Sequence, residues 1–108
     1  VNFAEEQAKK FGLRAPMVGH LGDGNFHVVL PYDPAKKEMY KKIREFNDLL
    51  IKEGLELNGT ITGEHGVGLH KKEYLLEEHP DNIPVMKSIK RTIDPNNIMN
   101  PGKIFDLN

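Results

Sequence analysis

The chain has 108 residues, a formal net charge of −1 and 38% hydrophobic residues, which indicates one small domain with a modest core. Charge is nearly balanced and no Lys/Arg-rich block occurs, so no nucleic-acid partner is expected. Cysteine is absent, which excludes disulfides, thiolate zinc sites and cysteine nucleophiles. No apolar run reaches the length of a membrane-spanning helix.

The chain opens with a predicted helix and a predicted β-hairpin. The helix covers residues 2–12, with Gly12 as its stop. Residues 14–31 predict the hairpin, because Asp23-Gly24 between extended segments favours a two-residue turn of type I′. This turn would place His20 directly opposite His27.

The two histidines are candidate metal ligands. Directly opposed residues share a face of the hairpin, with Cβ atoms roughly 5 Å apart. Two imidazoles at this separation can bind one ion such as zinc, manganese or iron. The alternative, two ordinary solvated or hydrogen-bonded histidines, stays open. The predicted faces are Met17, Gly19, Leu21, Phe26, Val28 and Leu30 for the core, and Val18, His20, His27 and Val29 for a cleft.

Three more helices are expected along the rest of the chain. Asp33-Pro34 predicts a helix start, and this helix should reach about Glu53 and end at Gly54. The segment that follows it, residues 55–62, is short and favours β structure. The other two helices are predicted over residues 69–78 and 84–93, and residues 96–108 are expected to form an ordered coil or to fold onto a partner surface.

Residues 63–68 form a glycine-rich loop that carries Glu64 and His65. Its spacing, G-x-x-G-x-G, matches neither the dinucleotide fingerprint nor a Walker loop, so a phosphate cradle is not indicated. Glu64 is the best third ligand, because two histidines and one carboxylate leave positions open for a substrate. A tight backbone turn without a ligand is the alternative. His65 fits a structural role about as well as a catalytic one.

The other polar residues have simpler interpretations. Surface roles are expected for His70, His79, Lys71 and Lys72, with contact between one lysine and an acidic ligand as the alternative. Asn97 and Asn100 are most simply turn residues.

Three ordered blocks of the sequence resemble a known family. They are residues 19–27 (GHLGDGNFH), residues 59–68 (GTITGEHGVG), and residues 94–103, which begin with Asp94-Pro95 and end with IMNPGK. Together they are similar to the C-terminal part of the FAD-linked oxidases of the vanillyl-alcohol-oxidase superfamily. The nearest branch is that of D-lactate dehydrogenase, glycolate oxidase and D-2-hydroxyglutarate dehydrogenase.

The resemblance implies a reaction and a set of site residues. The reaction is oxidation of a D-2-hydroxy acid of the lactate, glycolate or 2-hydroxyglutarate type to the 2-oxo acid, with hydride transfer to FAD. A quinone, a cytochrome or an electron-transfer protein would then accept the electrons. By position, His20, His27 and Glu64 match ligands of a divalent metal, His65 matches the active-site histidine, and Asn25 and Asn100 match asparagines close to the flavin or substrate.

The resemblance also sets the expected domain organisation. Family members carry an upstream FAD-binding domain, so residues 1–108 are expected to be a single C-terminal fragment without it, inactive in isolation. The expected fold is α+β: a small antiparallel sheet packed by helices, with the hairpin 14–31 and optionally a third strand near 55–62. It would form a partial ferredoxin-like cap plus a C-terminal helical lobe.

Partners and alternatives complete the expectations. A homodimer that pairs open sheet edges is one option. We expect a cytoplasmic protein, attached to a membrane at most peripherally through its electron-transfer partner. Two rival functions stay open: a small metal-dependent hydrolase, in which Glu64 or His65 activates a metal-bound water, and a non-catalytic module that binds metal or oligomerises.

Overall fold

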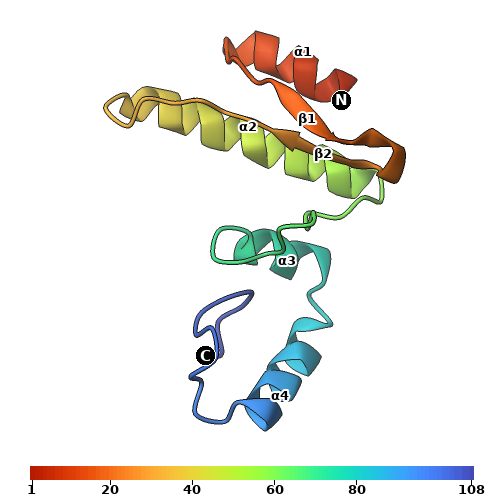
Figure 1. The fold of residues 1–108 in the computed structure, drawn as a ribbon, viewed down its shortest axis with the longest axis vertical. Helices are drawn as coiled ribbons and strands as arrows, with labels where there is room; N and C mark the ends of the chain where they lie inside the picture. Colours follow the sequence, from red (N-terminus) through yellow and green to blue (C-terminus); the bar gives the residue numbers. More distant parts are fainter. The chain divides into compact units, whose positions relative to one another are not determined.

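The computed structural model describes all 108 residues and divides them into two compact units, Val1–Leu57 and Asn58–Asn108 (Figure 1). Four helices and one two-stranded antiparallel sheet make up the chain, which confirms the expected α+β class. Each unit buries its own apolar residues. They are Ala4, Ala8 and Phe46 in the first unit, and Ile61, Val67, Leu75 and Ile83 in the second.

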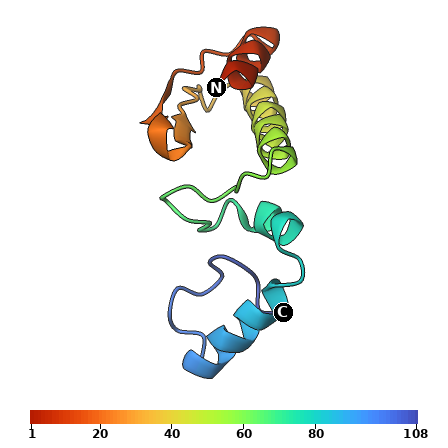
Figure 2. The ribbon, with the colours of Figure 1, turned by 90° about the vertical axis from the view of Figure 1, so that its right-hand side faces the viewer.

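The first unit has two layers. Helices α1 (Asn2–Phe11) and α2 (Lys37–Glu56) lie on one side, and strands β1 (Met17–His20) and β2 (Asn25–Val28) lie on the other (Figure 2). The ring of the fully buried Phe46 meets the ring of Phe11 edge to face, with centroids 6.2 Å apart. Such aromatic pairs add to the free energy gained by burying their area, so this contact fixes α1 on α2.

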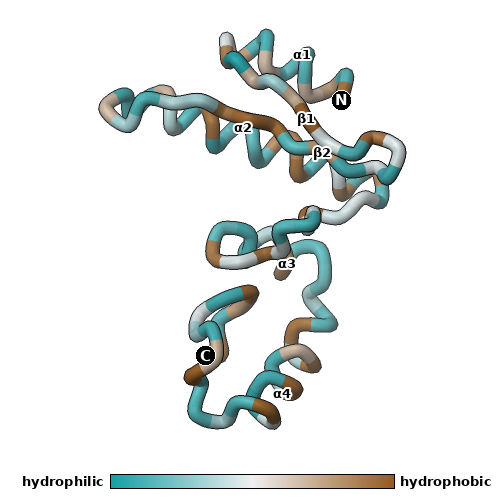
Figure 3. Tube along the Cα trace, in the orientation of Figure 1, coloured by the Kyte–Doolittle hydropathy of each residue, from teal (hydrophilic) through white to brown (hydrophobic).

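Hydrophilic and hydrophobic residues alternate along α2, as an amphipathic helix requires (Figure 3). Polar residues are so frequent in the longest helix that it cannot cross a membrane, and no other helix is long and apolar enough to do so.

The hairpin register differs from the predicted one. His27 lies opposite Val18, and His20 lies opposite Asn25, so the expectation that His20 faces His27 is wrong. The connection is a 3₁₀ turn over Leu21–Asp23 followed by Gly24. A type I′ turn needs positive φ at both central residues. Here only Gly24 adopts it, with φ of 71°, and Asp23 avoids the steric cost.

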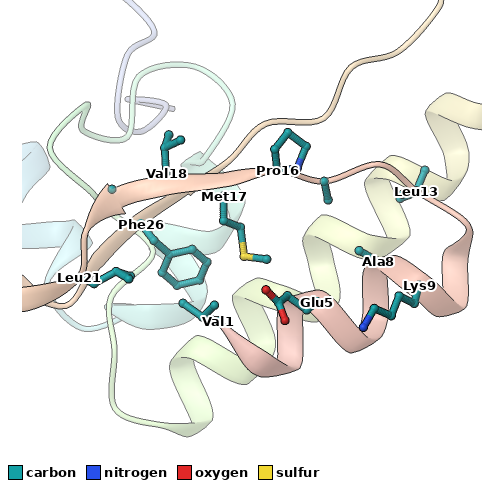
Figure 4. A pocket seen from close by; sticks show the side chains of 12 residues that line it. Val1, Glu5, Ala8, Lys9, Leu13, Pro16, Met17, Val18, Leu21 and Phe26 are labelled. Carbon is teal, nitrogen blue, oxygen red and sulfur yellow. The ribbon is translucent and has the colours of Figure 1, made fainter.

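The same residues share each face of the hairpin as predicted, but the face predicted to be core is not buried, and Leu21 and Phe26 on it are exposed. A shift of one residue would exchange the two faces, whereas the observed shift of two residues preserves them. Met17 and Phe26 point towards α1, and Val18 points away from it (Figure 4). A groove of about 780 Å³ separates α1 from the hairpin. Neither His20 nor His27 lines this groove, so the groove is not the candidate site.

Helix α2 begins and ends later than predicted. Asp33 does not cap it, because its Oδ1 accepts a hydrogen bond from Ala35 N (3.0 Å) in a turn before the helix. At the other end, α2 continues through Gly54 to Glu56. The half-buried Ile51 and Leu55 lie four residues apart and extend the apolar stripe, which offsets the cost of about 1 kcal/mol for a helical glycine.

This extension removes the third strand suggested near 55–62. Residues 55 and 56 are helical, and residues 57–62 form no regular element. Asn58 adopts a left-handed conformation (φ 58°) just after the helix, which directs the chain out of it.

The second unit contains helices α3 (Lys72–Glu78) and α4 (Ile83–Ile93). Helix α3 is shorter than the predicted 69–78, and α4 carries its proline in the first turn, where no amide hydrogen is needed. The C-terminal segment folds back along α4 (Figure 1), and Arg91 Nη2 donates to Leu107 O at 2.5 Å. This segment is therefore an ordered coil, as one of the two expectations stated.

Asp94, at the end of α4, is the one buried charged residue, with 5% of its surface exposed. Its Oδ1 accepts from Ile98 N at 3.0 Å, and its Oδ2 accepts from Met99 N at 2.9 Å and from Lys90 Nζ. The hydrogen bond from Lys90 holds the pKa of Asp94 below its ordinary value, with help from the two backbone amides and against the opposing effect of burial.

We predict that Gly19→Ala destabilises the hairpin. A Cβ at Gly19 would lie 2.5 Å from Phe26 Cα and 2.6 Å from Asn25 O, so backbone must move. Overpacking of this kind costs about 1–3 kcal/mol. Gly22→Ala is the matched control, because nothing lies within 4 Å of its added Cβ. Urea denaturation should show a lower free energy of unfolding for Gly19→Ala and an unchanged one for Gly22→Ala. An equal decrease in both variants would contradict the prediction.

We also predict that the charge of Asp94 makes the stability of the fold vary with pH in the acidic range. Its pKa is lower in the folded state, so its ionised form stabilises the fold above the unfolded value of about 3.9. This stabilisation is lost as the pH falls through the folded value. The melting temperature of Asp94→Asn should lie below that of wild type at pH 7, and the gap should close below pH 4. The exposed Asp81→Asn serves as control. A gap that stays constant to pH 2 would show that the charge of Asp94 is not its cause.

Candidate functional site

Three predicted site residues share one face of the hairpin. His20 ends β1 and lies opposite Asn25, while His27 lies opposite Val18, two residues before His20. The two histidines are therefore diagonal neighbours, a relation in which residues are roughly 7–8 Å apart and long side chains still meet. His20 is exposed, and Asn25 and His27 are half-buried. The hairpin brings two imidazoles and one amide to the same surface.

Glu64 and His65 occupy the centre of a β-turn. Gly66 N donates to Gly63 O at 3.1 Å, which closes the turn around the two residues. Neither Glu64 nor His65 has a positive φ, and a glycine follows them at the fourth turn position, as type I turns favour. This irregular backbone lets neighbouring side chains approach each other. Glu64 Oε1 lies 3.5 Å from His65 Nε2, within ion-pair distance when the imidazole is protonated.

Both side chains of this turn are accessible, with 51% of Glu64 and 76% of His65 exposed. An exposed carboxylate is a competent metal ligand, and an exposed imidazole can exchange a proton with a bound substrate. The turn therefore presents two different chemical groups side by side.

Asn100 lies in a turn of the C-terminal segment. It adopts a left-handed conformation (φ 46°), and its carbonyl oxygen accepts from Lys103 N at 3.3 Å. Asn97 is also left-handed (φ 50°), so both asparagines act as turn residues, as the simpler interpretation stated. The role of Asn100 near a flavin or substrate stays a prediction.

Sequence reasoning missed two residues that hold the glycine-rich loop. Lys71 Nζ donates to Ile61 O at 3.0 Å, and Glu78 Oε2 accepts from Ile61 N at 3.1 Å. The sequence pattern predicts a surface role for Lys71 and does not distinguish Glu78 from its neighbours. One signal is present in the sequence: positions 71, 75 and 78 share one face of a helix, with an apolar residue between two charged ones.

The residues predicted to bind one metal ion are divided between the units. The first unit supplies the imidazoles of His20 and His27, and the second supplies the carboxylate of Glu64. Imidazole nitrogen and carboxylate oxygen together suit zinc, manganese or iron. A metal site that uses all three residues stays a prediction.

Comparisons with known proteins identify the family. The family model of the C-terminal domain of FAD linked oxidases matches residues 1–104. The chain is 41% identical over 108 residues to "D-lactate dehydrogenase [cytochrome], mitochondrial" of Kluyveromyces lactis, which covers 99% of the chain and 18% of that protein. It is 39% identical over 99 residues to "Glycolate oxidase subunit GlcD" of Bacillus subtilis, covering 91% of the chain and 21% of that protein.

A third relative carries another substrate in its name. It is the "D-2-hydroxyglutarate dehydrogenase" of Stutzerimonas stutzeri, 43% identical over 90 residues that cover 81% of the chain and 19% of that protein. The chain thus spans about a fifth of the length of the curated relatives it matches. The family model matches almost the whole chain, and so the chain belongs to the family of C-terminal domains of FAD linked oxidases.

Proposed function

We propose that this chain is the substrate- and metal-binding part of a flavin-dependent dehydrogenase or oxidase. The whole protein would oxidise a D-2-hydroxy acid to the 2-oxo acid and transfer a hydride to FAD. Family membership and the names of the three relatives support this class of reaction. The observation that carries the proposal is the Gly63–Gly66 turn, which presents a carboxylate and an imidazole 3.5 Å apart.

The donor set of the proposed metal site fits a divalent ion. His20 and His27 share a hairpin face and offer imidazole nitrogens, and Glu64 offers a carboxylate oxygen from an exposed turn. Such a set leaves coordination positions open for a substrate. A bound divalent ion would supply Lewis-acid chemistry, by holding and polarising the substrate's carboxylate and hydroxyl groups.

His65 has a different role in the proposal. Its imidazole accepts the proton of the substrate hydroxyl as C2 gives its hydride to FAD, while Glu64 keeps the separate role of metal ligand. Imidazole titrates near neutral pH, which suits a group that takes up and releases one proton in each cycle. FAD, bound mainly by a domain outside these residues, would supply the redox chemistry.

The amides of Asn25 and Asn100 complete the proposed site. Each amide offers two N–H donors and one acceptor, which suits polar groups of a flavin or substrate. The proposal also includes the upstream FAD-binding domain and, as an option, a homodimer. The relatives of Kluyveromyces lactis and Arabidopsis thaliana carry "mitochondrial" in their names, which favours an organelle over the expected cytoplasmic location.

We predict that substitutions of Glu64 and of His65 in the full-length protein have different effects. Glu64→Gln should lower metal content and weaken substrate binding together, because it removes a charged ligand. His65→Ala should keep the metal and slow flavin reduction about 10²–10⁴-fold, the usual effect of losing a general base. Stopped-flow flavin reduction by D-lactate, glycolate or D-2-hydroxyglutarate, with metal analysis of both variants, makes the comparison.

Two results would contradict these roles. Flavin reduction at the wild-type rate in His65→Ala would place the base elsewhere. Loss of metal from His65→Ala as complete as from Glu64→Gln would make His65 a ligand.

We further predict that the 108 residues alone bind no FAD tightly and oxidise no hydroxy acid. The chain contains no dinucleotide fingerprint, and its glycine spacing is G-x-x-G-x-G. The purified chain should be colourless after incubation with FAD and gel filtration. A yellow protein with one FAD per chain would disprove the prediction.

A further inference from the structure

Ile61 is held at both of its backbone polar groups by side chains. Its N–H donates to Glu78 Oε2 at 3.1 Å, and its carbonyl accepts from Lys71 Nζ at 3.0 Å. In a sheet, a neighbouring strand would satisfy these two groups, but Ile61 belongs to no strand. The side chain of Ile61 is also buried, with only 7% of its surface exposed. This residue is therefore fixed by two hydrogen bonds and by packing.

The two side chains that bind Ile61 stand at the two ends of α3. Lys71 directly precedes α3, Glu78 ends it, and Leu75 lies between them with 5% exposure. Spacings of four and seven residues bring the three to one side of a helix. The carboxylate of Glu78 is 9% exposed, and its Oε1 lies 3.3 Å from His79 Nε2. This second contact orients the carboxylate and leaves Oε2 for Ile61.

The clamp formed by Lys71 and Glu78 lies next to the turn that carries the candidate site. Ile61 comes two residues before Gly63, where the turn around Glu64 and His65 begins. At the far end of the loop Val67 is buried, and Gly68 O accepts from Ile104 N at 2.8 Å. Residues 62–66 thus form a short span between two fixed points. Because glycines at 63 and 66 leave the backbone permissive, the position of the span depends on its ends.

We propose that Lys71 and Glu78 are positioning residues that fix the Glu64–His65 turn through the backbone of Ile61. This inference rests on the proposed function, because it assigns to the clamp the placement of the proposed metal ligand and proton acceptor. Neither positioning residue touches the substrate. A displacement of about 1 Å in a reacting group can cost 10²-fold in rate, so the clamp acts on flavin reduction without taking part in it.

Glu78→Ala in the full-length protein is the central test, with Glu77→Ala on the exposed side of the same helix as matched control. Glu78→Ala should speed amide exchange of the peptide spanning residues 59–69 and slow flavin reduction about 10- to 100-fold at saturating substrate. Glu77→Ala should change neither. Glu78→Gln should restore both, because an amide oxygen also accepts from Ile61 N. A merely structural role would lower the melting temperature without slowing flavin reduction in the folded protein.

Lys71→Met is the second variant, for the case in which Glu78→Ala does not fold. Methionine keeps an unbranched apolar chain like the stem of lysine and removes only the hydrogen bond to Ile61 O. It should repeat both effects, and Lys71→Arg should reverse them. The inference would be overturned by amide exchange at the wild-type rate in folded Glu78→Ala or Lys71→Met, or by flavin reduction at the wild-type rate in either variant. Failure of Glu78→Gln to restore the slow exchange would also overturn it. A wild-type protein that reduces no flavin with any of the three acids would instead refute the proposed function. The exchange measurement would still decide whether the clamp holds the loop.

Discussion

Left-handed backbone at a few glycines and asparagines is the constraint on which the candidate site depends. Gly24 alone takes positive φ in the hairpin connection, and this sets which residue lies opposite His27. Gly66, with φ of 72°, closes the turn that presents Glu64 and His65. Asn100 reverses the chain in the C-terminal segment. Residues without this conformational freedom would give other turns, and the side chains would point elsewhere.

Ile104 is the one residue with positive φ that is neither glycine nor asparagine, and its strain shows how strongly the second unit constrains its loops. A β-branched residue with φ of 69° is a steric outlier, which costs of order 1–3 kcal/mol. Its N–H donates to Gly68 O at 2.8 Å, and two residues later Asp106 pairs with Lys72 at 2.7 Å. These bonds tie the C-terminal segment to the end of the glycine-rich loop and offset the strain.

The sequence predicted the helices and which hairpin residues share a face, because both depend on periodicity, but it did not predict that the supposed core face is left open. The expected apolar stripe of α2 contains the fully buried Phe46, and Met17 and Phe26 point towards α1. It did not predict the register, since Asp23-Gly24 is compatible with more than one turn and the choice depends on whether Asp23 accepts positive φ. The end of α2 was missed because Leu55 continues the stripe past Gly54.

The contacts that hold the candidate site were harder to predict for a different reason. Helix capping and turns act between residues a few positions apart, and their signals lie in adjacent letters. Glu78 binds the backbone of a residue seventeen positions earlier, and Lys71 binds it from ten positions away. Any residue type at position 61 offers the same N–H and carbonyl, apart from proline, so Ile61 itself gives no sign of these partners.

The second unit has no strand, and side chains satisfy backbone groups that a sheet would otherwise pair. Asp94 binds two amides, Lys90 donates to Met99 O at 2.5 Å, and the Lys71–Glu78 clamp binds Ile61. Hydrogen bonds to charged groups are stronger than neutral ones, so a few of them can order long loops. Such loops can hold polar groups at an exposed surface without the geometric restrictions of a sheet. Glu64 and His65 illustrate this freedom: in a strand, neighbouring side chains point to opposite faces, whereas a turn between two anchored ends places their polar atoms 3.5 Å apart.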